Sequence, residues 1–262
     1  YGTDHCPGYG SAAKYIATSV MEVARDTVVY DTGVVTIIEC MGRHAGWLTA
    51  AAALANLSEH SCDLIYLPER DFDIDQFLAD VERVYKAKGN CIVAVSEGVH
   101  YADGTFVSEA KTSGTDGFGH AQLGGLAARL AGLVKAKMGI KTRGIELSLL
   151  QRCAAHCASK TDIDEAFLAG KTAVESMLDG VTDKMVGFEC SRENGYTCST
   201  RLIDLSDVAN YENKVPKEWI NEAGNDITKD FINYALPLIQ GETPMKKKNG
   251  LPDFAVLKRV FA

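Results

Sequence analysis

The chain has 262 residues, of which 46% are hydrophobic and 24% charged, and its formal net charge is -8. This composition is typical of a globular protein, and the length allows one large domain or two ordinary ones. The acidic balance argues against non-specific nucleic-acid binding but permits a local cationic pocket for an anionic ligand. No apolar run reaches the roughly 20 residues of a membrane span, and no secretory leader pattern is visible. We therefore expect a cytoplasmic protein with no membrane partner and with its eight cysteines reduced.

Helical and strand-like patterns alternate along the first 150 residues. In chain order they predict a helix over 11–26, a strand over 34–39, a helix over 46–57, a strand over 63–67, a helix over 74–88, a strand over 91–96, a helix over 120–138 and a strand over 142–148. Short, continuous apolar strands separated by helices are typical of a parallel sheet covered on both faces. The sequence predicts an α/β domain over residues 1–150.

The pattern changes in the remaining residues. A capping pattern at Thr161 and Asp164 predicts a helix that ends near Leu178. Two strands, over 184–188 and 200–205, are predicted to form a hairpin, and helical segments follow near 216–221 and 228–240. We interpret residues 151–205 as part of a second domain and residues 206–262 as a C-terminal helical extension.

The polar stretch 98–119 has no clear period. Because it is longer than an ordinary connection, it is a candidate functional loop, although a surface insertion has the same appearance.

Arg43 and Glu97 each follow a predicted parallel strand. In an open α/β sheet the carboxyl ends of the strands form the ligand-binding edge. The planar fork of Arg43 suits a phosphoryl group, and the helix start behind it adds backbone N–H groups. Glu97 suits sugar hydroxyls or acid–base work. The alternatives remain a surface salt bridge for Arg43 and a solvated carboxylate for Glu97.

Arg143 and Arg152 bracket the last predicted strand of the sheet. Arg152 lies beyond the carboxyl end, where it can reach the same site as Arg43. Arg143 enters at the opposite edge, so it is better placed for a neighbouring subunit or for a salt bridge, and a salt bridge also remains an alternative for Arg152.

Two further segments invite a functional interpretation. Cys153, His156 and Cys157 have the spacing of one helix face, but a fourth ligand with zinc-type spacing is absent, so we expect ordinary packing and no metal site. The glycine-containing segment 8–14 lacks the ending of a P-loop, and we interpret it as a helix start that points N–H groups at an anion.

Several of these segments together resemble the phosphofructokinase family. The segments that carry the resemblance, which continues to about residue 216, are GTDHCPGYGSAAKYIA at 2–17, ECMGRHAGW at 39–47, VAVSEG at 93–98, DGFGHAQLGG at 116–125 and KTRGIELSLLQR at 141–152. The sequence is most similar to the long bacterial forms that use pyrophosphate. The resemblance implies a Rossmann-like parallel sheet flanked by helices, with part of a second α/β domain.

The resemblance also implies a reaction, the transfer of a phosphoryl group to the 1-hydroxyl of fructose 6-phosphate with Mg²⁺ as the metal. By motif match, Arg43 would be catalytic and would contact substrate together with Met41 and Gly42. Glu97 would hold sugar hydroxyls, and Arg143 would be offered across the interface of a homodimer or homotetramer. The remaining substrate-binding candidates are Leu149, Gln151 and Arg152, of which Arg152 would bind the 6-phosphate.

The sequence departs from the family pattern at three places. The TIDND segment with the general base and the glycine-rich donor loop are absent, so the chain is expected to be an inactive fragment without its N-terminal part. Leu149 stands where an aromatic residue or histidine is common, and Val34 stands where short ATP-type relatives carry an arginine. Pyrophosphate is therefore the expected donor. The alternatives are an ATP-dependent enzyme, a non-catalytic sugar-phosphate-binding subunit and an unrelated α/β binding module.

Overall fold

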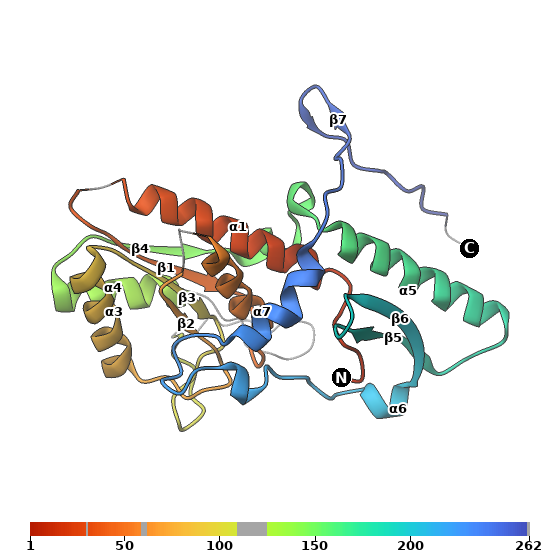
Figure 1. Ribbon diagram of the computed structural model, residues 1–262, viewed down its shortest axis with the longest axis horizontal. Coiled ribbons are helices and arrows are strands. Elements are labelled where there is room, and N and C mark those ends of the chain that lie inside the picture. The colour runs from red at the N-terminus through yellow and green to blue at the C-terminus, as the bar shows by residue number, and fades with distance from the viewer. Residues whose placement is uncertain (30, 59–61, 109–124, 261–262) are drawn as a thin grey trace.

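A four-stranded parallel sheet with helices on both faces forms the larger lobe of the protein (Figure 1). The computed structural model describes residues 1–29, 31–58, 62–108 and 125–260. The sheet has the order β2-β3-β1-β4, with bounds β1 Val35–Cys40, β2 Leu64–Tyr66, β3 Cys91–Ser96 and β4 Thr142–Glu146. This confirms the predicted α/β class, with a parallel sheet flanked by helices.

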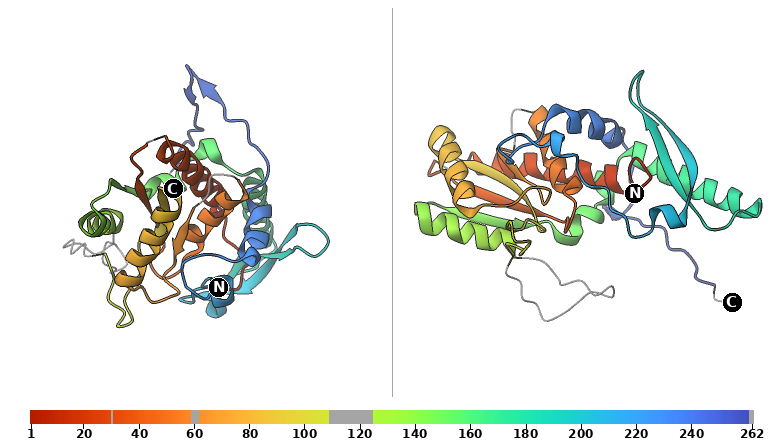
Figure 2. Two further views of the ribbon diagram at one scale, coloured as in Figure 1. Left: turned by 60° about the vertical axis from the view of Figure 1, so that its left-hand side comes forward. Right: turned by 90° about the horizontal axis from the view of Figure 1, so that it is seen from below.

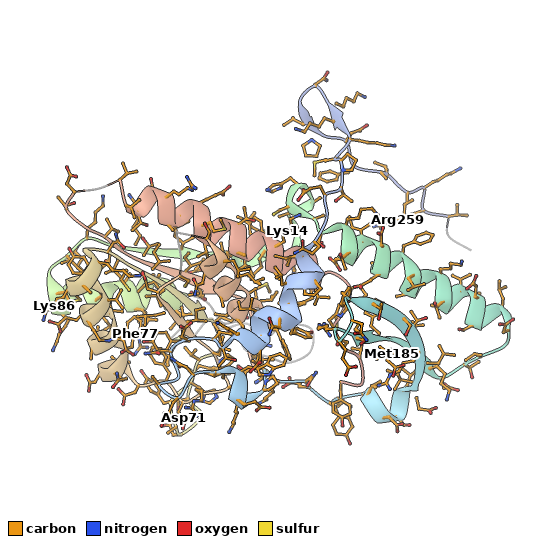
Figure 3. The ribbon with its side chains drawn as sticks, viewed as in Figure 1. Lys14, Asp71, Phe77, Lys86, Met185 and Arg259 are labelled. Carbon is orange, nitrogen blue, oxygen red and sulfur yellow. The ribbon has the colours of Figure 1, made fainter. Side chains whose placement is uncertain are left out.

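The alternation of side chains along the strands divides the core into two halves. Ile38 of β1 and Ala94 of β3 face α1 (Tyr9–Thr27) and the turns α2 (Trp47–Ala50) and η1 (Ala51–Leu57). Ile37 and Val93, which pair in the β1–β3 register, face α3 (Ile74–Lys88) and α4 (Leu126–Met138). Both strands are buried along their whole length, which is why they read as continuous apolar runs. Phe77 of α3 is fully buried in this second half (Figure 3).

A smaller lobe contains a long helix and a hairpin (Figure 2). Helix α5 (Lys160–Leu178) follows two short turns, η2 (Ser148–Arg152) and η3 (Ala155–Cys157), and packs on the antiparallel strands β5 (Lys184–Ser191) and β6 (Thr197–Asp204). The predicted hairpin is confirmed, but its strands are longer than predicted because polar residues continue the ladder to the Ser191–Thr197 pair.

In the C-terminal part, residues 217–239 pack on the larger lobe. The elements of this part are α6 (Leu205–Val208), η4 (Lys217–Trp219), α7 (Lys229–Ala235), η5 (Leu236–Ile239), β7 (Lys247–Lys248) and β8 (Leu251–Pro252). The extension is therefore only partly helical, since β7, which belongs to the lysine run, pairs with β8 in a small hairpin. Within the described ranges, no helix combines the length and the apolar character that a membrane crossing requires.

Some helix and strand boundaries match the prediction and others differ from it. The helix over 74–88 and the strand over 91–96 match residue for residue. The predicted helix over 46–57 is mostly a 3-10 helix, and it begins without a side-chain cap. The helix expected from residue 120 is described from Leu126 onward, behind Gly125, and residues 120–124 lie outside the described residues. The same holds for residues 109–119 of the candidate loop, whose described part contains a bridge between His100 and Phe106.

Candidate active site

The site lies where β1 and β3 end side by side. Cys40 and Ser96, the last residues of the two strands, are direct partners in the parallel register. The backbone N–H of Glu97 donates to the Cys40 carbonyl at 2.9 Å, which extends the pairing by one step. The segment Met41-Gly42-Arg43 therefore leaves the sheet directly beside Glu97.

Glu97 is joined to this segment by a hydrogen bond and by charge. Its Oε1 accepts the N–H of Gly42 at 3.1 Å, and the Ser96 hydroxyl donates to the Gly42 carbonyl at 2.5 Å. Burial raises the pKa of Glu97 above its ordinary value, and the Gly42 hydrogen bond and the Arg43 guanidinium oppose that rise. Arg43 and Glu97 thus lie on adjacent segments at the strand ends, as their positions in the sequence predict.

Two glycines make this close approach possible. A Cβ atom on Gly98 would stand 1.9 Å from the carbonyl oxygen of Arg43, and one on Gly42 would stand 2.6 Å from the carbonyl oxygen of Ala45. Gly42 also has a φ of 150°, which side chains rarely permit. The loop that carries Arg43 is therefore packed backbone against backbone on the end of β3.

Arg152 approaches from the turn after β4. The Leu147 N–H donates to the Glu39 carbonyl, so the β1–β4 ladder continues up to the start of the turn η2. Within that turn Leu149, Leu150 and Arg152 are exposed, whereas Gln151 is only 1% exposed. Arg152 lines a cavity of about 230 Å³ together with residues of the α1 start and the α5 start.

Gln151 is buried and bonds to the backbone of Met41, which is half-buried. Gln151 Oε1 accepts the Met41 N–H at 3.2 Å, while its Nε2 donates to the Ser148 carbonyl at 2.8 Å. The side chain that the resemblance assigns to substrate binding is thus bonded to the protein at both ends. Leu149 is 53% exposed on the same turn and offers no polar atom to a phosphate.

Arg143 lies away from these residues. It pairs with Thr36 in the β1–β4 register, near the amino ends of the strands, and its Nη1 donates to Asp26 at 2.5 Å. The structure thus separates Arg143 from Arg43 within one chain. The predicted position at the opposite edge is confirmed, and the salt-bridge interpretation describes what the side chain does here.

Two carboxylates that the sequence analysis did not identify, Glu39 and Glu146, lie near Glu97. Glu39 is 4% exposed within β1, and its Oε2 accepts the N–H of Ala127 at 2.8 Å, while Glu146 Oε1 accepts the N–H of Gly125 at 3.0 Å. Burial, with smaller contributions from Glu146 and Glu97, raises the pKa of Glu39 to about 7 against the hydrogen bond from Ala127. These two carboxylates accept N–H groups at the start of α4. A single glutamate in the apolar run VVTIIEC is the signal that reveals Glu39.

A carboxylate of the protein also accepts the N–H groups at the start of α1. Asp162, which is 5% exposed, accepts the N–H of Gly8 at 2.7 Å and that of Ser11 at 3.0 Å. The anion that this helix start faces is therefore a carboxylate of α5. Of the cysteine and histidine group, Cys153 and His156 are exposed, and Cys157 Sγ donates to Thr18 at 3.6 Å.

Comparison with known proteins identifies the family of this chain. The sequence profile described as Phosphofructokinase matches residues 1–177. The chain is 44% identical over 260 residues to the pyrophosphate–fructose 6-phosphate 1-phosphotransferase of Halomonas elongata, covering 98% of this chain and 62% of that protein. The chain belongs to the phosphofructokinase family, and it spans less than two thirds of the length of this relative.

Two solved structures have the same fold. The pyrophosphate-dependent phosphofructokinase from Nitrosospira multiformis superposes with a TM-score of 0.84 at 38% identity, covering 98% of this chain and 63% of that one. The corresponding protein from Marinobacter aquaeolei gives 0.83 at 38% identity, covering 96% and 60%. Because the matches cover 98% and 96% of this chain, they include both of the lobes that Figure 1 shows.

Proposed function

We propose that this chain supplies the sugar-phosphate site of an enzyme that transfers a phosphoryl group from pyrophosphate to the 1-hydroxyl of fructose 6-phosphate. The observation that carries the proposal is the convergence of Arg43 and Glu97 at the aligned ends of β1 and β3. The relatives named pyrophosphate–fructose 6-phosphate 1-phosphotransferase support the donor and the acceptor. An ATP-dependent enzyme and a non-catalytic sugar-phosphate-binding subunit are the alternatives.

In this proposal each polar side chain has a separate task. Arg43 contacts the bound sugar phosphate and stabilises the charge that develops on the transferring phosphoryl group, since such reactions depend on positioning and on electrostatics. Glu97 keeps Oε2 for a sugar hydroxyl, because Oε1 is bonded to Gly42. Arg152 binds the 6-phosphate from the cavity beside α1. Arg143 would serve a neighbouring subunit of a cytoplasmic homodimer or homotetramer only by exchanging its bond with Asp26.

The described residues do not fit a magnesium site. Mg²⁺ prefers six oxygen ligands in near-octahedral geometry. In the part of the chain that the structure describes, the metal-ligand side chains that come together are Asp4, His5 and Cys190, and both oxygens of Asp4 are bonded to Arg192. We propose that Mg²⁺ accompanies the donor and that the general base and the donor loop belong to the part of the relatives that this chain does not span.

Titration of the chain with fructose 6-phosphate tests the sugar-phosphate site. We expect Arg152→Ala to weaken binding by about 1.5–3 kcal/mol, because it removes hydrogen bonds between charged groups. Arg259→Ala, in the exposed C-terminal tail, is the matched control and leaves the affinity unchanged. Calorimetry with fructose in place of its 6-phosphate isolates the phosphate contribution. Equal affinity of the wild type and of Arg152→Ala would contradict the assignment.

A turnover assay separates the proposal from its alternatives. With fructose 6-phosphate, Mg²⁺ and either pyrophosphate or ATP, we expect binding without product from this chain alone. Adding a polypeptide with the remaining part of the Halomonas elongata relative should restore turnover with pyrophosphate. Restoration with ATP only would favour the ATP-dependent enzyme, and failure with both donors would favour the non-catalytic subunit.

A further inference from the structure

Two neighbouring amides in the Arg43 loop are held from opposite sides. The Gly42 N–H is bonded to Glu97 at the end of β3, and the Met41 N–H is bonded to Gln151 on the turn after β4. Because the β1–β4 ladder ends with the hydrogen bond from the Leu147 N–H to the Glu39 carbonyl, the bond between Met41 and Gln151 is the next connection between the two chain segments beyond the sheet. It joins the loops that carry Arg43 and Arg152.

The chemistry of this connection requires an amide side chain. Gln151 must accept a hydrogen bond from Met41 and donate one to the carbonyl of Ser148, and it does both while 1% exposed. The glutamine amide supplies both the donor and the acceptor without charge. Ser148 has a φ of 43°, so the carbonyl that Gln151 binds belongs to a strained turn residue.

We infer that Gln151 is a positioning residue that sets the spacing between Arg43 and Arg152. Arg43 is two residues after Met41, and Arg152 directly follows Gln151, so the bond between Met41 and Gln151 fixes both loops relative to each other. This inference rests on the proposed function, since the spacing matters for a ligand that both arginines contact. Both ends of the Gln151 amide are bonded to the backbone, so the role assigned to it is to place the two loops, beside the cavity that it lines together with Arg152.

Comparison of a two-point ligand with a one-point ligand tests this role. Fructose 6-phosphate needs the correct spacing of Arg43 and Arg152, whereas inorganic phosphate needs only one of them. For Gln151→Met, which keeps the volume and removes both hydrogen bonds, we expect about tenfold weaker binding of fructose 6-phosphate and less than a twofold change for inorganic phosphate. Equal weakening of the two ligands, or no weakening of either, would overturn the inference.

Amide hydrogen exchange at Met41 provides a readout that does not depend on ligand. In the wild type we expect this amide to exchange slowly, as the neighbouring strand amides do, and in Gln151→Met at least tenfold faster. Gln240→Met is the matched control, because Gln240 also donates from Nε2 to a backbone carbonyl, that of Leu236, but is exposed. It should change neither the exchange at Met41 nor ligand binding.

The outcomes separate the inference from the proposed function. If the wild type binds neither ligand, the proposed function fails, and exchange at Met41 alone decides whether Gln151 holds the loop. If Gln151→Met does not fold, Gln151→Glu replaces it, because the carboxylate keeps the acceptor for Met41 and loses the donor to Ser148. Rapid exchange of Met41 in the wild type would overturn the inference without any variant.

Discussion

Helices α1 and α5 have the same length, 19 residues, but they are held in opposite ways. α1 buries a face of small and branched apolar residues that includes Ile16 and Val20, both fully buried. The buried residues of α5 are Asp162 and Glu165, whereas its Phe167 is 74% exposed. Figure 1 shows α1 lying along the sheet and α5 extending beyond it. One helix is therefore fixed by apolar burial and the other by hydrogen bonds of carboxylates.

The exposed face of α5 agrees with the limited share of the relatives that the chain spans. Its apolar residues recur at Ile163, Phe167, Val174 and Met177, each at least 43% exposed. This spacing is that of a helix face that packs on another element. Met185 of the neighbouring strand β5 marks the same lobe in Figure 3. The polar network of α5 therefore fixes its position, while its apolar face remains open in the described part of the chain.

The largest effect is expected from the network that holds α5. Buried His5 bonds to Asp4 at 2.9 Å and to Glu165 at 2.7 Å. Burial alone would lower the pKa of His5, but its hydrogen bonds with Asp4, Cys190 and Glu165 raise it to about 11. We expect His5→Leu to reduce the free energy of unfolding near neutral pH by about 3–5 kcal/mol, because it leaves the buried carboxylate of Glu165 without its cation.

The pH dependence of the loss in unfolding free energy shows whether the positive charge of His5 causes it. Because the pKa of His5 is raised from 6.5 to about 11 on folding, its contribution is complete below pH 6.5 and is lost as the pH rises through about 11. Urea unfolding of the wild type and of His5→Leu should therefore give a difference that shrinks between pH 7 and pH 10.5. A difference that stays constant over this range would mean that packing, and not charge, holds the lobe.

The next largest difference is expected when an apolar side chain is truncated in each of the two helices. Ile16→Ala is expected to lower the stability of the fold by about 3 kcal/mol, because it leaves a cavity under α1. Phe167→Ala removes a larger side chain from α5, but the change should stay within about 0.5 kcal/mol because the ring is exposed. Chemical denaturation followed by circular dichroism measures both. A loss of more than 1 kcal/mol for Phe167→Ala would show that its ring is covered in solution.

These two helices also show how far the sequence predicts the structure. α1 was predictable because its apolar residues recur at helical spacing, and the strands because they are buried on both faces. The convergence of Arg43 and Glu97 followed from their positions after parallel strands. The roles of Asp162, Glu165 and Gln151 were not predictable, because each partner lies far away in sequence, up to 160 residues for His5 and Glu165. The spacing of a polar residue on a helix does not reveal a partner in another element.

A smaller effect is expected where the two helices meet. Asp162→Ala removes the acceptor for the N–H groups of Gly8 and Ser11 and should reduce stability by about 1–2 kcal/mol, as loss of a helix cap does. Asp164→Ala removes a carboxylate of the same helix that pairs with Lys160 in solvent, and its effect should be below about 0.5 kcal/mol. Thermal unfolding of the two variants provides the comparison. Equal shifts would contradict the capping role of Asp162.

The smallest effect is a stabilisation at a glycine of α5. A Cβ atom on Gly170 meets no atom within 4 Å, and the residue lies inside the helix, so Gly170→Ala should raise the free energy of unfolding by about 0.5–1 kcal/mol. Gly10→Ala is the counterpart in α1, where the added Cβ would stand 2.2 Å from the carbonyl oxygen of Leu238. That variant should be destabilised, because packing outweighs helix propensity wherever two backbones touch. Urea unfolding at one pH measures both signs, and a destabilised Gly170→Ala would mean that the open face of α5 is covered by a close neighbour in solution.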